Sequence, residues 1–328
     1  MRLETVTVVG GGAWGSALAQ AAATAGRPVT LIARDEKIVD EINTRHTNTR
    51  YLGGLALDVR IVAESLFVPA DIVVMAVPAQ ATRQALAAID PEFLARRPVV
   101  LTAKGLETGT LERQSEILGA MAPLAVPYVL SGPSFAADVA AGRPTAVTLA
   151  GDGASDTSEL AAALAGPSLR PYAADDRVGV EIAGALKNVY ALACGAVEGA
   201  GLGFSARSAL MARAYAEMAR IVTAMGGSAT TLTGLAGLGD LTLSCTTPQS
   251  RNYTFGLALG RGESTQEILA GGAGLAEGVA TAPVAAELAE RFEVDAPLVA
   301  AVNQLLTGVA SITHIVAGLM ARPLKRES

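Results

Sequence analysis

A glycine-rich turn near the start of the chain is the feature that most restricts its fold. Gly10-Gly11-Gly12-Ala13-Trp14-Gly15 follows the β-branched run Thr5–Gly10 and opens the alanine-rich stretch Trp14–Ala25. In such a turn, Gly10 permits the tight bend, Gly12 lets the backbone approach a pyrophosphate, and Gly15 lets the helix pack on the strand. The start of the helix offers free amides to a phosphate. We expect a dinucleotide-binding unit here, and the alternative is a glycine-rich turn in an α/β domain without a ligand.

Strand and helix signals alternate through the first half of the chain. Short apolar runs that predict strands occur at Thr5–Gly10, Pro28–Ala33, Asp71–Val77, Val99–Thr102, Tyr128–Leu130 and Ala146–Ala150. Continuous apolar strands between helices indicate a mainly parallel sheet that is covered on both faces. This half is therefore predicted to be an α/β, doubly wound (Rossmann) domain, with its ligand outside the carboxyl ends of the strands.

The second half has few strand signals. Helices are predicted at Val178–Val197, Ser205–Met225, Tyr253–Leu259, Val279–Arg291 and Pro297–Leu306, with glycine-rich loops among the connections. A chain of 328 residues is also long enough that two domains are expected from its length. We predict a dinucleotide-binding domain at residues 1–177 and an all-helical substrate and catalytic domain at 178–328.

Charge and hydropathy exclude several classes of partner. The net charge is −6 and lysine and arginine do not cluster, which argues against nucleic-acid binding. Glu181, Lys187 and Glu198 interrupt the most apolar stretch, so no membrane insertion is predicted. The N-terminus has no signal-peptide pattern. We expect a cytoplasmic protein.

The few cysteines and histidines argue against a metal site or a disulfide framework. The chain has two cysteines and two histidines, at Cys194, Cys245, His46 and His314. Their spacing matches no zinc motif, so the cysteines are interpreted as reduced thiols. No metal cofactor is predicted.

The end of the second predicted strand bears on the choice of dinucleotide. Arg34 follows Leu31-Ile32-Ala33 and suits the 2′-phosphate of NADP(H). Asp35 could instead hold the ribose hydroxyls of NAD(H). NADP(H) is favoured and NAD(H) is kept as possible. Trp14 either packs locally or covers the cofactor.

Four further segments place polar residues where an apolar core would not. Lys104 ends an apolar strand, and Ser131–Ala136 ends another and opens a helix. Lys187 interrupts an apolar helix and needs a partner or a lowered pKa. Asp240 follows Gly237-Leu238-Gly239, and Ser250-Arg251-Asn252 is expected to cap a helix beginning near Tyr253, which suits a phosphate dianion.

These residues together predict the reduction of a small phosphorylated ketone. Such a reduction needs a proton donor at the ketone oxygen, for which Lys187 is the candidate. Lys104 would polarise the same oxygen or orient the substrate. Taken singly, Lys104 and Arg251 could be structural charges, Ser134 and Ser250 helix caps, and Asp240 a turn residue.

Several segments resemble those of the bacterial NAD(P)-dependent glycerol-3-phosphate dehydrogenases, and they occur in the order that this family shows. The similar segments are Gly10–Ala19, Lys104-Gly105-Leu106-Glu107, Ser131–Ala136, Gly184–Val189, Gly234–Leu241, Ser250-Arg251-Asn252 and Ala276-Glu277-Gly278-Val279. They cover nearly the whole chain.

The resemblance implies reversible reduction of dihydroxyacetone phosphate to sn-glycerol 3-phosphate, which feeds phospholipid synthesis. It implies that Lys187 is the catalytic proton donor and acceptor. The substrate-binding residues that it implies are Lys104, Gly132, Ser134, Lys187, Asp240, Ser250, Arg251 and Asn252. The implied cofactor contacts, beyond Gly10, Gly12 and Gly15, are Trp14, Arg34, Lys104, Ala136, Arg251, Leu275 and Glu277.

Departures from the family pattern, such as Gly53 after Tyr51-Leu52, affect cofactor preference more than reaction type. Two other functions remain open at this point. One is a β-hydroxyacid or ketopantoate reductase, whose carboxylate substrate Ser250-Arg251-Asn252 would bind less completely. The other is a non-catalytic NADPH-binding regulator, which would not need both Lys104 and Lys187. The apolar helical half makes a homodimer plausible.

Overall fold

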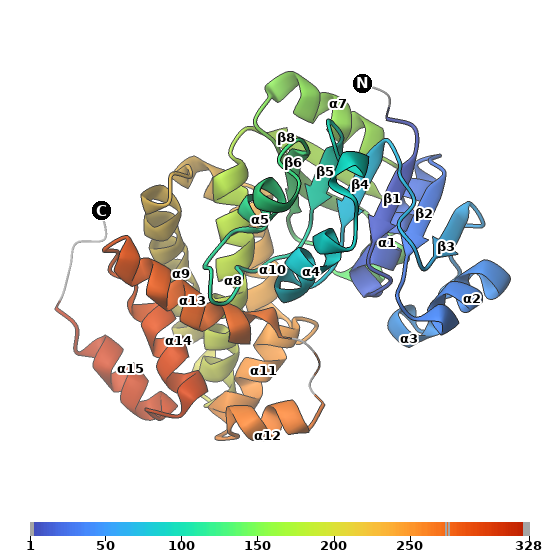
Figure 1. Ribbon diagram of the computed structural model, residues 1–328. Helices are drawn as coiled ribbons and strands as arrows, with labels where there is room; N and C mark the ends of the chain where they lie inside the picture. The colour runs from blue at the N-terminus through green and yellow to red at the C-terminus, as the bar shows by residue number, and fades with distance from the viewer. Residues whose placement is uncertain (1–2, 273, 275, 324–328) are drawn as a thin grey trace.

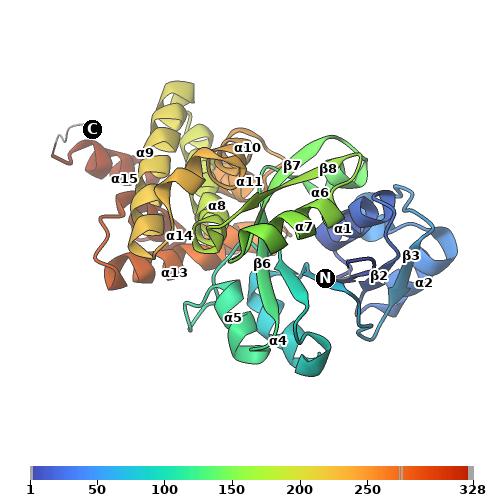
Figure 2. The ribbon, with the colours of Figure 1, turned by 90° about the horizontal axis from the view of Figure 1, so that it is seen from above.

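The computed structural model describes residues 3–272, 274 and 276–323, and has a sheet part and a helical part (Figures 1 and 2). In the described residues, an eight-stranded sheet has the strand order β3-β2-β1-β4-β5-β6-β7-β8. Its strands are β1 (Val6–Val9), β2 (Val29–Ile32), β3 (Ile61–Glu64), β4 (Ile72–Met75), β5 (Pro98–Leu101), β6 (Val126–Ser131), β7 (Thr145–Ala150) and β8 (Leu169–Ala174).

The central strands end at one common edge of the sheet. Val9 lies opposite Met75, Met75 opposite Leu101, and Leu101 opposite Val129, all in parallel pairs. Among the described strands, the β6–β7 pair is the antiparallel one. The glycine turn, Lys104 and Gly132 therefore all follow strands that end at the same edge. The prediction of a mainly parallel, doubly wound sheet is confirmed.

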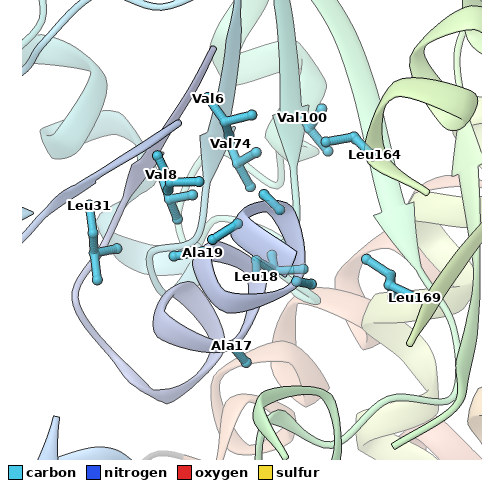
Figure 3. Close-up of a cluster of buried hydrophobic side chains, with 14 of the residues drawn as sticks. Val6, Val8, Ala17, Leu18, Ala19, Leu31, Val74, Val100, Leu164 and Leu169 are labelled. Carbon is cyan, nitrogen blue, oxygen red and sulfur yellow. The ribbon is translucent and has the colours of Figure 1, made fainter. Parts of the chain in front are cut away.

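Helices cover both faces of the sheet because successive strand residues point to opposite sides. Val6 and Val8 of β1 pack with α1 (Ala13–Thr24), α6 (Ala136–Ala140) and α7 (Ala154–Leu164) (Figure 3). Val9 belongs to the opposite cluster, with α4 (Thr82–Ala87) and α5 (Gln114–Met121). The edge of the sheet at β2 and β3 carries α2 (Glu36–Arg45) and α3 (Thr49–Leu52). Helical turns also occur at η1 (Ala79–Ala81) and η2 (Pro91–Phe93).

The helical part is organised around α8 (Arg177–Gly199), which runs through its core. Asp176 caps α8 by accepting a hydrogen bond from the backbone N–H of Gly179 at 2.8 Å. The other elements are α9 (Gly203–Ala224), η3 (Ala229–Thr233), the π-helical turn η4 (Leu235–Gly239), α10 (Asp240–Thr246), α11 (Arg251–Gly260), α12 (Thr265–Ala270), α13 (Glu277–Arg291), α14 (Pro297–Thr307) and α15 (Ile312–Met320). Within the described residues, α8 alone is long and apolar enough to cross a membrane, and its apolar window is fully buried in the fold.

Glycines let α8 and α11 meet backbone to backbone. A Cβ added to Gly195 of α8 would lie 2.1 Å from the carbonyl oxygen of Tyr253. One added to Gly256 of α11 would lie 2.1 Å from the carbonyl oxygen of Leu192. Both distances are far below van der Waals contact, so any side chain would force the two helices apart.

Several elements were not expected from the sequence. These are β3, α3, α7, β8, α10 and α12. Helix α11 begins at Arg251 rather than near Tyr253, because the Ser250 side chain accepts a hydrogen bond from the Tyr253 N–H and so occupies the N-cap position. The sheet ends at Ala174 and α8 begins at Arg177. We retain the division after residue 177 as a proposal.

Candidate functional site

The glycine turn has the geometry that a pyrophosphate site needs. Gly10 has φ +123°, and a Cβ there would lie 2.5 Å from the carbonyl oxygen of Ala76. A Cβ on Gly15 would lie 1.8 Å from the Gly10 carbonyl oxygen, whereas one on Gly12 would meet nothing within 4 Å. No described side chain caps α1, so its first amides can bind an anion. The turn therefore fits a dinucleotide, and half-buried Trp14 packs beside it.

Arg34 and Asp35 follow the end of β2 but lie in different environments. Arg34 is exposed. The Oδ1 atom of Asp35 accepts a hydrogen bond from the Lys37 N–H at 3.0 Å and caps α2. Its Oδ2 atom forms an ion pair with Arg50 at 3.2 Å. At this strand end the arginine is thus exposed, while the Asp35 carboxylate is partly exposed and already paired.

Two lysines, Lys187 buried and Lys104 partly buried, share one carboxylate where the two parts of the molecule meet. Lys104 Nζ lies 2.6 Å from Asp240 Oδ2, and Lys187 Nζ lies 3.0 Å from Asp240 Oδ1. Lys104 also donates to the carbonyl oxygen of Gly132 at 3.0 Å, and Lys187 donates to Ser244 Oγ at 2.7 Å. The side chains of both lysines and of Asp240 are at most 14% exposed.

Charge balance makes this cluster suited to an anion. Burial lowers the pKa of Lys104, as does the positive charge of Lys187, and the carboxylate of Asp240 opposes this shift. Burial alone would raise the pKa of Asp240, but the two lysines outweigh it and lower that pKa. With Asp240 ionised and both lysines protonated, one positive charge is left over. A partly negative oxygen placed here would be stabilised by it.

The loop that carries Lys104 is held by three carboxamide side chains. Asn188 Nδ2 donates to the carbonyl oxygen of Lys104 at 2.9 Å. Gln114 Nε2 donates to the next carbonyl, of Gly105, at 2.9 Å, and Gln80 Nε2 donates to that of Leu106 at 2.7 Å. The backbone position of Lys104 is therefore fixed from α8, α5 and η1 together.

The start of α11 is linked to the lysine cluster through Asn188. Asn252 Nδ2 donates to Asn188 Oδ1 at 2.9 Å, while Asn252 Oδ1 accepts from the Gly278 N–H at 2.9 Å. Ser250 caps α11, and Arg251 is exposed and has no ion-pair partner within the described part of the chain. Both lie at the same helix end as Asn252, which is buried.

The remaining residues that the sequence singled out lie around this cluster in different ways. Gly132 has φ +147° at the end of β6, and its carbonyl oxygen accepts from Ser134 Oγ at 3.0 Å. Ala136 begins α6. Glu277 begins α13, and its Oε1 atom accepts from the Ala79 N–H at 3.3 Å across the two parts of the molecule. Leu275 lies outside the described residues.

Three residues that hold the two lysines or the Lys104 loop were missed in the sequence, namely Ser244, Gln114 and Gln80. Ser244 bonds Lys187 and lies 3.4 Å from Asp240 Oδ1, and its position four residues after Asp240 on one helix face could have indicated this. Gln114 gives no sequence signal, because its partner is a backbone carbonyl nine residues away.

The described residues include no group of three or more His, Cys, Asp or Glu that could hold a metal ion. Cys194 and Cys245 are both buried free thiols. Contact with Cys194, together with burial, raises the pKa of Cys245, which keeps that thiol protonated.

A dinucleotide-type sheet joined to a buried lysine–carboxylate cluster defines a nicotinamide-dependent oxidoreductase of two parts. The family model for the N-terminus of NAD-dependent glycerol-3-phosphate dehydrogenase matches residues 5–157, and the model for its C-terminus matches residues 176–317. The chain therefore belongs to the NAD-dependent glycerol-3-phosphate dehydrogenase family.

Individual relatives agree with this assignment over the full length. The chain is 46% identical to glycerol-3-phosphate dehydrogenase [NAD(P)+] of Maricaulis maris, covering 99% of this chain and 98% of that one. It is 48% identical to the enzyme of the same name from Methylobacterium radiotolerans, with both chains covered completely. The crystal structure of glycerol-3-phosphate dehydrogenase from Coxiella burnetii matches with a TM-score of 0.89 at 34% identity, covering 98% of this chain and 100% of that one.

Proposed function

We propose that this oxidoreductase transfers a hydride reversibly between NAD(P)H and dihydroxyacetone phosphate, giving sn-glycerol 3-phosphate for phospholipid synthesis. The family membership supports this reaction. The observation that carries the proposal is the buried Lys104–Asp240–Lys187 cluster, whose surplus positive charge suits a ketone oxygen that becomes an alkoxide.

Lys187 is proposed as the proton donor for reduction and the acceptor for oxidation. When bound, the reduced nicotinamide supplies the hydride. Lys187 Nζ then gives a proton to the ketone oxygen, and its contacts with Asp240 and Ser244 hold Nζ in place. Lys104, fixed by Asp240 and the Gly132 carbonyl, polarises the same oxygen or orients the substrate.

The phosphate of the substrate is assigned to the start of α11. Arg251 and the first amides of the helix favour a dianion, and Ser250 and Asn252 flank them. Gly132 and Ser134 are proposed to contact the substrate from the end of β6. Asn252 bonds Asn188, next to Lys187, which supports placing the phosphate and the ketone in one site.

The cofactor is assigned to the glycine turn, with NADP(H) favoured over NAD(H). Gly10, Gly12, Trp14 and Gly15 would hold the pyrophosphate half, and exposed Arg34 would face the 2′-phosphate. Asp35, which an NAD(H) ribose would bind, already has one partner on each oxygen, so a ribose would have to compete with them. Further cofactor contacts are proposed for Lys104, Ala136, Arg251, Leu275 and Glu277.

The test is an assay of the purified chain with dihydroxyacetone phosphate, in which NADPH and NADH are followed in parallel by absorbance at the reduced nicotinamide band. We expect oxidation of both, faster with NADPH. Turnover with ketopantoate but not with dihydroxyacetone phosphate would assign the chain to the carboxylate reductases. Cofactor binding without turnover of either ketone would indicate a regulator.

We also propose where this enzyme acts, what it binds besides its substrate and cofactor, and how it assembles. A cytoplasmic enzyme that needs no metal and binds no nucleic acid or membrane is consistent with the charge of −6 and the buried α8. A homodimer remains a proposal, which sedimentation equilibrium would test.

A further inference from the structure

We propose that Arg50 is a specificity-determining residue, which favours NADP(H) by keeping the Asp35 carboxylate out of the ribose site. The inference rests on the proposed NAD(P)-dependent function and deepens it. Arg50 lies on α3, a short helix that the sequence did not predict, and no role in the reaction is otherwise assigned to it.

Asp35 stands one residue beyond Arg34, at the strand end where a carboxylate would select NAD(H). Its two oxygens together offer about four lone-pair sites to hydrogen-bond donors. Here Oδ1 accepts from the Lys37 N–H at 3.0 Å, and Oδ2 pairs with Arg50 at 3.2 Å. An NAD(H) ribose would therefore have to compete with Lys37 N–H and Arg50 for this carboxylate.

Helix α3 is anchored in a way that brings Arg50 to this point. Asn48, just before α3, is fully buried and donates from Nδ2 to the Gly11 carbonyl oxygen at 3.0 Å and to Ser16 Oγ at 2.8 Å. Glu41 of α2 accepts from the Thr49 N–H at 2.8 Å. The segment is thus tied both to the glycine turn and to α2, the helix that Asp35 caps, and this holds Arg50 close to Asp35.

The electrostatic consequence differs for the two cofactors. A 2′-phosphate carries up to two negative charges and would be repelled by an unpaired Asp35 beside Arg34. Pairing with Arg50 reduces that repulsion, whereas the same pairing competes with an NAD(H) ribose for the carboxylate. Arg50 therefore acts through Asp35, and its effect has opposite signs for NADPH and NADH.

This dependence can be tested with Arg50→Gln, Asp35→Asn and the double variant. Asparagine is as good an N-cap as aspartate, so Asp35→Asn removes the charge and keeps the start of α2. The dissociation constants of NADPH and NADH are measured by quenching of Trp14, the sole tryptophan, which lies in the glycine turn. This readout does not require turnover.

We expect Arg50→Gln to weaken NADPH binding and to tighten NADH binding, each roughly fivefold, the upper range for an exposed ion pair. Asp35→Asn should not weaken NADPH binding, and the double variant should bind both cofactors like Asp35→Asn alone. Arg50→Lys should keep most of the preference. Arg45→Gln, which removes a nearby charge without a contact to Asp35, is the control and should leave the ratio unchanged.

Two results would overturn the inference. If the double variant loses NADPH affinity as much as Arg50→Gln does, Arg50 binds the phosphate directly. If Arg50→Gln leaves the NADPH to NADH ratio unchanged, Arg50 has no part in the choice. Failure of the wild-type chain to bind either dinucleotide would instead refute the proposed function.

Discussion

Lys187 Nζ and Asp240 Oδ1 lie 3.0 Å apart, although the two residues are on different helices and far apart in the chain. Asp240 is the first residue of α10, directly after the π-helical turn η4, and Lys187 is in the middle of α8. Because Asp240 also holds Lys104 at 2.6 Å, one carboxylate sets the position of both ammonium groups.

Replacing the proposed proton donor should stop chemistry without preventing cofactor binding. We expect Lys187→Ala to lower kcat about 10²–10⁴-fold, the usual contribution of a general acid. The dissociation constant of NADPH, measured by Trp14 quenching, should change little. Near-normal turnover in steady-state assays would remove Lys187 from this role.

Loss of the guanidinium at the start of α11 should weaken binding of the phosphorylated ketone. A hydrogen bond to a charged group contributes about 1.5–3 kcal/mol, so Arg251→Ala should raise KM for dihydroxyacetone phosphate about tenfold or more. Arg261, at the other end of the same helix, provides the matched control as Arg261→Ala. Equal effects of the two variants would place the phosphate elsewhere.

The lowered pKa of Lys104 predicts opposite pH trends in activity and stability. As pH rises, Lys104 loses its proton at a lower pH than a lysine with the ordinary pKa of 10.5 would. In the pH profile, kcat/KM should therefore fall on the alkaline side already below pH 10.5. In this window the unfolded chain binds more protons than the folded one, so this residue's contribution to stability rises with pH. Asp240→Asn should move this alkaline fall to lower pH, because the carboxylate raises the pKa of Lys104. If Asp240→Asn leaves the pH of this alkaline fall in kcat/KM unchanged, the fall does not come from deprotonation of Lys104.

The carboxamide contacts to the Lys104 loop should differ in importance. Gln114 is 1% exposed, so Gln114→Met leaves the buried Gly105 carbonyl without its donor, at a cost of about 1–3 kcal/mol. We expect kcat/KM for the ketone to fall about tenfold as the loop relaxes. Gln80 is exposed, and water can replace it, so Gln80→Met should have a much smaller effect. Similar kinetics for the two variants would argue against this positioning role.

Glycines in two helices should respond oppositely to alanine. Gly256→Ala should destabilise the fold by about 1–3 kcal/mol or more, since the new Cβ would lie 2.1 Å from the Leu192 carbonyl oxygen. Gly119 of α5 has nothing within 4 Å of its Cβ position, so Gly119→Ala should stabilise by about 0.5–1 kcal/mol. Urea unfolding measures both. A neutral Gly256→Ala would mean that the helices can separate without loss.

The sequence was most informative where local pattern and tertiary structure agree. The glycine turn and the apolar central strands were predicted because β1, β4 and β5 are continuous buried runs. Strand β3 was missed because alternate residues are exposed at the sheet edge, and β8 because exposed Arg170 and Tyr172 interrupt it. Helix α10 follows a glycine-rich π-turn that has no periodic signal.

Within the site, the candidate residues could be named but their partners could not. Lys187 was singled out because a charge in an apolar helix needs compensation, yet nothing local indicates that Lys104 shares Asp240 with it. The proposed role of Asp35 also depends on Arg50, fifteen residues later on α3, a helix that follows the buried Asn48.

The crossing of α8 and α11 sets the spacing between two site residues as well as forming part of the core. Lys187 lies on one of these helices and Arg251 begins the other, and the glycine contacts bring the two backbones into direct contact, so they cannot come any closer. If the ketone and phosphate ends of a substrate bind these two residues, their separation acts as a ruler set by the main chain. Longer or shorter phosphorylated ketones would then fit this backbone spacing less well, and only the side chains of Lys187 and Arg251 could adjust to them.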